Sequence, residues 1–324
     1  MAGFILQRLL QGIVIMIVMS MIVFGGIHAI GNPMDVLIPP EATQDVRERT
    51  IARFGLDKSL VEQYVIFVRN LLQGDLGRSY IYNEPVLQLI ANRFPATIEL
   101  VFTAVLGALL IGVPLGVYAG YRPDSLGARL IMSVSILGFS VPTFWVGLIL
   151  ILTFAVNLGW LPSGGRGDTV EVFGIGWSVL TVNGWSHLVM PATNLALFKL
   201  AIMIRLARAG TREIMLTDTV KFARAAGLSE ATILSRHVLK LIAIPIVTVF
   251  GLELASTLAF AVVTETIFSW PGVGKLIIDS IKNLDRPVMV AYLILTAGLF
   301  VTVNLVVDIV YAVLDPRLRR RAAT

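Results

Sequence analysis

Three polar residues lie inside long apolar stretches of the sequence, where polar side chains are rare. They are Lys199, Glu253 and Asn304. A polar side chain at such a position marks a substrate or ion pathway unless a neighbouring group neutralises it or hydrogen-bonds to it. Glu253 would contact a substrate or a coupling ion, or would be neutral or hydrogen-bonded to a partner subunit. Lys199 would extend toward water or face a wet cavity. We take the three as candidate pathway residues.

The sequence has no motif for ATP hydrolysis or for hydrolytic catalysis. G-x-x-x-x-G-K-[ST] is absent, so we do not expect this chain to bind ATP. H-E-x-x-H is absent as well, and the 3 histidines lie in different segments, which disfavours a zinc protease and a serine–histidine dyad. Without cysteine there is no thiolate metal site and no cysteine nucleophile. We therefore predict a protein that is not an enzyme and that binds no metal or cofactor itself.

The composition is that of an integral membrane protein. Of the 324 residues 56% are hydrophobic and 15% charged, and the mean hydropathy is +0.83, which is too apolar for an ordinary soluble domain. The net charge of +5 is positive, but the basic residues lie beside apolar stretches and are not interleaved with aromatic residues. This arrangement favours a role in membrane topology over nucleic-acid binding.

Six apolar stretches are long enough to cross a hydrocarbon core of about 30 Å. They are 9–30, 100–121, 131–158, 188–206, 242–268 and 288–314. The first exceeds the roughly 7–15 residues of a signal-peptide core and no A-x-A site follows it, so we predict an uncleaved signal-anchor helix within 1–30. Pro142 interrupts the third stretch and would either kink a packed helix or break a helix that lines a pathway. The predicted fold class is therefore all-α, with six transmembrane helices.

The polar segment 31–95 lies between the first two stretches and predicts two amphipathic helices, 41–54 and 58–73. Asp57 is a candidate N-cap for the second helix and Gly74 its expected stop. With the N-terminus in the cytoplasm, this segment is extracytoplasmic.

The remaining chain, 96–316, would hold the other five transmembrane helices, followed by a basic tail, 317–324. By the positive-inside rule the tail is cytoplasmic, which places both termini on the same side as six spans require. Glu99 and Glu265 lie at the outer ends of their stretches, where we expect them to reach water.

Loop 211–241 is the only extended charged stretch in the second half of the chain, and its excess of Lys and Arg predicts that it faces the cytosol. A helix is expected over 213–226, with Gly227 as a left-handed stop. Ser229 is a good N-cap for a second helix, and Glu230 suits its positive end. Two short helices hinged at a glycine form a surface that another protein could bind.

The string ARAAGLSEATILSRH, followed by Pro245, resembles the cytoplasmic loop of ABC importer permeases of the dipeptide, oligopeptide and nickel group. Gly227, Ala223 and Leu239 fit the general loop pattern of that family, whereas Lys221 replaces its glutamate; the peptide subgroup shows similar departures. Five more strings resemble the same group and occur in the same order: GNPMDVL, RFGLDKSLVEQY, LLQGDLGRS, NRFPATIELV and TETIFSWPGVGKLIIDSI.

The resemblance implies the type I ABC importer permease fold, with an extracytoplasmic helical segment between the first two membrane helices. It also implies that loop 211–241 couples this subunit to ATPase subunits. The implied coupling residues are Lys221, Ala223, Arg224, Ala225, Ala226, Gly227, Leu228, Ser229, Glu230, Arg236 and His237. The implied partners are a homologous second permease, two ATPase subunits that hold ATP and Mg²⁺, an extracytoplasmic solute-binding protein and membrane lipid, with no nucleic acid. The implied location is the bacterial inner membrane.

Peptide is the expected solute, although nickel, opines, glutathione and sugars are carried by similar proteins. The alternative from another class is an ion-coupled secondary transporter, in which Glu253, Asp308 and Lys199 would form a proton relay. Inverted repeats would be expected for such a transporter, and the sequence shows none.

Overall fold

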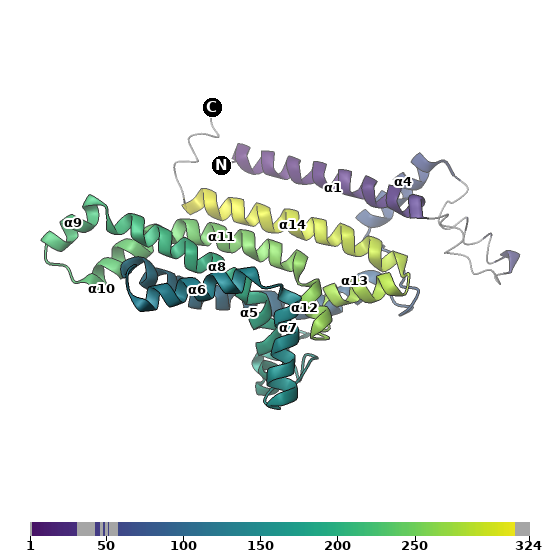
Figure 1. Ribbon diagram of the computed structural model, residues 1–324. Helices are drawn as coiled ribbons and strands as arrows, with labels where there is room; N and C mark the ends of the chain where they lie inside the picture. Colours follow the sequence, from purple (N-terminus) through teal and green to yellow (C-terminus); the bar gives the residue numbers. More distant parts are fainter. Residues whose placement is uncertain (1, 31–42, 46–47, 49–50, 52–57, 315–324) are drawn as a thin grey trace. The chain divides into compact units, whose positions relative to one another are not determined.

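The computed structural model describes residues 2–30, 43–45, 48, 51 and 58–314 (Figure 1). They divide into two compact units. Of the described residues, the larger unit contains those of Phe94–Lys275 and 303–314, and the smaller unit contains those of Ala2–Arg93 and Leu276–Thr302. The expected basic tail, 317–324, lies outside the described residues.

The larger unit is built around helix α8 (Val182–Met215). This helix packs against its neighbours α6, α7, α11 and α12. The bounds of these helices are Leu126–Ser140, Thr143–Leu150, Leu239–Phe260 and Val262–Ile267. One apolar core includes Leu188 and Leu195 of α8, together with Trp270, whose indole Nε1 donates a hydrogen bond to the Ala96 carbonyl oxygen at 2.8 Å.

Helix α5 (Val86–Tyr121) approaches α8 closely because glycines line the contact. A Cβ atom built on Gly116 would lie 2.5 Å from the Ile204 carbonyl oxygen, and one built on Gly120 would lie 2.7 Å from the Arg208 carbonyl oxygen. No side chain fits at these positions without a shift of the backbone. Small residues at such contacts let membrane helices pack backbone against backbone.

The third apolar stretch is broken and not merely kinked. Helix α6 ends at Ser140, Pro142 is the N-cap of α7, and the two helices meet at a bend of 105°. A proline lacks the N–H that would continue the helical ladder, and it disfavours helical dihedrals at the preceding residue. Figure 1 shows α7 turning away from the direction of α6. A π-helical turn, Ile151–Asn157, continues α7.

The segment that follows contains a hairpin that the sequence pattern did not predict. Strands β1 (Val170–Val172) and β2 (Ile175–Trp177) pair antiparallel, and Val170 faces Trp177. The two turn residues, Phe173 and Gly174, both have positive φ angles of 54° and 76°, as a type I′ turn requires. A short 3₁₀ turn, Ser178–Leu180, then leads to α8, which Thr181 caps by accepting a hydrogen bond from the Gly184 N–H.

The smaller unit contains α1 (Ala2–Ile30), α4 (Leu60–Leu72) and the first part of α14 (Arg286–Leu314). Ser20 of α1 hydrogen-bonds to the hydroxyl of Tyr64 on α4 at 2.7 Å. The expected second amphipathic helix is therefore present, but Ser59 is its N-cap, in a capping box with Glu62. Asp57, the predicted cap, lies outside the described residues, as does most of the predicted helix 41–54.

Among the described residues, five helices are long and apolar enough to cross a membrane, or six if the bent pair that begins with α6 and α7 counts as one span. The fourth predicted stretch proves much longer than expected, because α8 continues to Met215. The fifth ends sooner: its candidate span stops at Leu258, and Glu265 lies beyond it on α12. Helix α13 (Val273–Lys282) begins directly after Gly272.

Candidate functional site

Two of the three candidate pathway residues form an ion pair inside the larger unit. The Nζ atom of Lys199, on α8, lies 2.5 Å from Oε2 of Glu253, on α11. The two side chains are only 12% and 16% exposed. Lys199 also donates a hydrogen bond to the Ser256 hydroxyl at 3.2 Å, and this hydroxyl lies 3.0 Å from the Glu253 carbonyl oxygen. Each charge therefore has a partner, which offsets much of the cost of burying it. Asn304 is partly buried on α14.

Loop 211–241 is anchored by apolar side chains. Helix α9 (Asp218–Ala225) buries Val220 and Ala223, while the π-helical turn after α10 (Glu230–Thr232) buries Ile233 and Val238. These side chains join one apolar cluster with Ala207 of α8 and with Ile242 and Ile246 of α11. Figure 1 shows α9 and α10 at one end of the α8–α11 pair. The loop is therefore packed onto the ends of two membrane helices.

The turn between α9 and α10 has the left-handed backbone conformation that was predicted at Gly227. Gly227 has a φ angle of 81°, and the N–H of Leu228 donates to the Ala223 carbonyl oxygen at 3.1 Å. Together with the bond from Gly227 N to the Arg224 carbonyl oxygen at 2.9 Å, this is a Schellman motif. Ser229 caps α10 by accepting a hydrogen bond from the Thr232 N–H.

An ion pair joins the two sides of this turn. Arg224 Nε and Nη2 donate to the two carboxylate oxygens of Glu230 at 2.7 and 3.2 Å. This hydrogen bond lowers the pKa of Glu230 below its ordinary value and raises the pKa of Arg224. A second pair, Lys221 with Asp218 at 2.9 Å, lies entirely within α9 and does not cross the turn.

The two most exposed large apolar side chains of the loop lie on its outer surface. Phe222 is 77% exposed and Leu216 is 71% exposed. The structure turns Phe222 outward and buries Val220 and Ala223 of the same helix. The remaining predicted coupling residues are arranged around it: Ala225, Ala226, Leu228 and Arg236 are exposed, and His237 is partly buried.

Glu99 and Glu265 do not reach water, contrary to the expectation from their positions. Glu99 is 3% exposed, and its carboxylate is 2.8 Å from Nη2 of Arg166 and accepts a 2.7 Å hydrogen bond from the Val179 N–H. Glu265 is fully buried and accepts hydrogen bonds from Thr97 Oγ1 at 2.7 Å and from the Lys275 N–H at 2.9 Å. Both acids hold outer segments of the larger unit to its helices.

The comparison with known families decides the class of the protein. The family described as "Binding-protein-dependent transport system inner membrane component" matches residues 112–320, and the corresponding N-terminal family matches residues 1–101. This chain belongs to that family of ABC importer permeases. The permease is thus a multi-pass inner-membrane protein and a transport subunit, as the sequence motifs predicted.

Curated relatives match the permease over nearly its whole length. It is 39% identical to the di/tripeptide transport system permease protein DppB of Pseudomonas aeruginosa, covering 99% of this chain and 100% of the relative. It is 37% identical to the oligopeptide transport system permease protein AppB of Bacillus subtilis, over 98% and 99%. It is also 34% identical to the glutathione transport system permease protein GsiC of Escherichia coli, again over 98% and 99%.

A solved structure shows the same fold. The inward-facing MetNI methionine ABC transporter matches with a TM-score of 0.56 at 16% identity, over 71% of the permease and 97% of the matched chain. This agrees with the predicted type I importer fold.

Proposed function

We propose that the permease forms half of the translocation pathway of an ATP-driven importer of short peptides and that loop 211–241 transmits the work of ATP hydrolysis to it. The complete transporter would contain a homologous second permease, two ATPase subunits that hold ATP and Mg²⁺, and an extracytoplasmic solute-binding protein. Both termini and loop 211–241 would face the cytoplasm.

The proposed coupling role rests on one observation about loop 211–241. Loop 211–241 combines a rigid attachment to α8 and α11 with an outward surface that exposes Phe222 and Leu216 beside charged residues. Large exposed apolar side chains rimmed by polar ones are typical of protein contacts. Because Val220 and Ile233 are fully buried against the membrane helices, a force on the exposed face would be passed to those helices.

Peptide is the proposed solute because two of the similar proteins are named as di/tripeptide and oligopeptide permeases. The relative named for glutathione, itself a tripeptide, is slightly less similar. Uptake of a labelled dipeptide by cells with the whole transporter tests the assignment. Excess unlabelled peptide should compete, whereas excess nickel should not; competition by nickel with no effect of peptide would contradict it.

The coupling role is tested by two glycine substitutions that impose the same local strain. Gly227 and Gly159 have positive φ angles of 81° and 62°, and a Cβ atom built on either would meet no atom within 4 Å. Gly159 lies in the segment before the hairpin, far along the chain from loop 211–241. In the reconstituted transporter, Gly227→Trp should abolish the stimulation of ATP hydrolysis by the binding protein, while Gly159→Trp should retain it. Equal hydrolysis in both variants would refute coupling through this loop.

The orientation can be measured directly because the chain has no cysteine. Phe222→Cys and Phe173→Cys would each place one thiol at a site that is 77% or 100% exposed. A membrane-impermeant maleimide added to intact spheroplasts should label the second variant only, and disruption of the membrane should allow labelling of the first. Labelling of Phe222→Cys in intact spheroplasts would reverse the proposed topology.

A further inference from the structure

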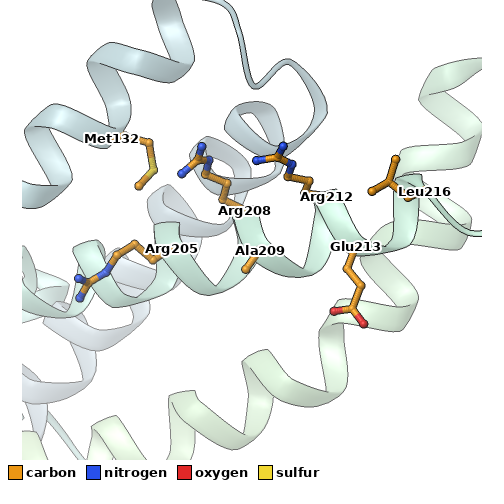
Figure 2. Close-up of a pocket in the computed structure, with 7 residues that line it drawn as sticks. All are labelled: Met132, Arg205, Arg208, Ala209, Arg212, Glu213 and Leu216. Carbon is orange, nitrogen blue, oxygen red and sulfur yellow. The ribbon is translucent and has the colours of Figure 1, made fainter.

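Three arginines of α8 line one hollow in the larger unit. Arg205, Arg208 and Arg212 surround a space of about 570 Å³. Figure 2 shows the residues that line it, which also include Met132 of α6. The remaining lining residues are Ala209, Glu213 and Leu216. We call this space the arginine hollow. Arg212, Glu213 and Leu216 are also part of loop 211–241, whereas Arg205 and Arg208 precede it.

The arginine hollow is positively charged and not neutralised by the side chains around it. At about 100° per residue, Arg205, Arg208 and Arg212 fall within an arc of about 60° on the helix. In Figure 2 the guanidinium groups of Arg208 and Arg212 point to the same side of α8 as Met132, whereas the Glu213 carboxylate points to the opposite side. Among the described side chains, none forms an ion pair with any of the three arginines.

One donor in the arginine hollow is buried without a partner. The Nε atom of Arg208 is inaccessible to solvent and has no hydrogen-bond acceptor among the described residues. A buried donor left unpaired is costly, more so on a charged group. The guanidinium of Arg205 stacks over the ring of Phe139 at 4.6 Å, which holds the group in place but supplies no acceptor. The terminal Nη atoms of Arg208 are not among these buried atoms and donate no hydrogen bond to the described residues, so they are the donors that an anion in the arginine hollow would bind.

The place of the arginine hollow along α8 indicates where that anion comes from. A helix of 34 residues is about 51 Å long, well beyond a hydrocarbon core of about 30 Å, so its last turns emerge from the apolar layer. The three arginines occupy those last turns. Met132 and Leu216 beside them present apolar surface, as a ligand with both an anionic group and hydrocarbon would need.

We propose that the arginine hollow binds the phosphate of an anionic phospholipid headgroup. The guanidinium fork matches two phosphate oxygens at once. Basic pockets between membrane helices are sites where anionic headgroups bind. Free phosphate shares this chemistry, but it makes no use of the apolar side of the arginine hollow. Arg205 and Arg208 precede loop 211–241, so lipid binding that depends on these two arginines can be measured separately from the coupling role of the loop.

Lipid binding to the purified transporter, measured by native mass spectrometry, tests this proposal. Phosphatidylglycerol and phosphatidylcholine are titrated onto wild type and onto R205Q/R208Q/R212Q. Removing three arginines should weaken phosphatidylglycerol binding on the order of a hundredfold, at about 1 kcal/mol for each charge, and should leave phosphatidylcholine binding unchanged. The matched control, K58Q/R69Q/K282Q, removes three exposed cations elsewhere and should bind phosphatidylglycerol like wild type.

Two results would overturn the proposal. One is equal affinity for phosphatidylglycerol in the two triple variants. Binding would then depend on the net charge of the protein and not on the three arginines of the hollow. The other is retention of inorganic phosphate by wild type with no preference for phosphatidylglycerol over phosphatidylcholine, which would assign the arginine hollow to a free anion.

If the triple variant does not assemble, R208Q and R208K replace it. R208Q should lose about fivefold in phosphatidylglycerol affinity. R208K keeps the charge but not the fork and should fall between R208Q and wild type.

Discussion

Arg224 and Glu230 form a two-pronged ion pair across the turn at Gly227, with contacts of 2.7 and 3.2 Å. Among the described side-chain hydrogen bonds, only those of this pair join α9 to α10. Arg224→Gln should loosen the turn and reduce stimulation of ATP hydrolysis by the binding protein without unfolding the permease. Lys221→Gln is the control, because it removes an exposed pair that stays within α9. If Arg224→Gln and Lys221→Gln lost the same amount of stimulation, the effect would come from the removed positive charge and not from the lost link between α9 and α10.

The same pair predicts a pH dependence. The hydrogen bond from Arg224 lowers the pKa of Glu230 in the folded protein. The pair therefore contributes fully above the ordinary pKa of a glutamate and is lost as the pH falls through the lowered value. In Arg224→Gln the Glu230 carboxyl should titrate at a higher pH than in wild type, which carbon NMR of labelled glutamate measures, with Glu230→Gln used to assign the signal. An unchanged midpoint would mean that the pair does not form in solution.

The Lys199–Glu253 pair predicts that a single substitution lowers thermal stability more than removal of both charges does. Glu253→Gln leaves the Lys199 ammonium buried without its counter-charge, which typically costs about 3–5 kcal/mol. Lys199→Met combined with Glu253→Met removes both charges and should recover most of the lost thermal stability. Thermal unfolding of the detergent-solubilised permease measures both.

The double variant also separates the two transport hypotheses. If the pair is structural, the variant lacking both charges should still transport peptide. A proton relay through Glu253 would instead be abolished in that variant even though the protein is stable, and this result would favour the ion-coupled alternative.

Two glycines of α5 predict opposite effects of the same substitution. Gly116→Ala would place a Cβ 2.5 Å from the Ile204 carbonyl oxygen, and overpacking of this kind costs about 1–3 kcal/mol. Gly107→Ala meets no atom within 4 Å and should gain about 0.5–1 kcal/mol from helix propensity. Thermal unfolding monitored by size exclusion compares them. Destabilisation by both would show that the contact with α8 is not the cause.

Sequence rules for helix caps and stops correctly predicted the features that depend only on residues close in sequence. Gly227 and Ser229 end and begin their helices as expected, because each acts through backbone groups within a few residues. The hairpin at Phe173 was missed because two three-residue strands give too short an alternating pattern to be detected.

Features that depend on distant partners could not be predicted from the same rules. Lys199 and Glu253 were each recognised as unusual, but nothing in their own segments indicates that they pair. Glu265 was expected to reach water because of its position at the end of an apolar stretch; Thr97, which donates to its carboxylate, is 168 residues away in sequence. The arginines at 205, 208 and 212 could have been noticed from their helical spacing alone. The coupling and pathway roles themselves remain predictions.

The buried pair between α8 and α11 also restricts how the permease can change shape. A slide of one helix past the other by a single turn, about 5.4 Å, would separate the ammonium of Lys199 from the carboxylate of Glu253 and leave both largely enclosed charges without a partner. Apolar side chains tolerate several alignments, but one fixed pair of opposite charges tolerates a single register. Helices α8 and α11 must then travel through the transport cycle as one rigid piece, and the motion between its states has to occur at other helix contacts.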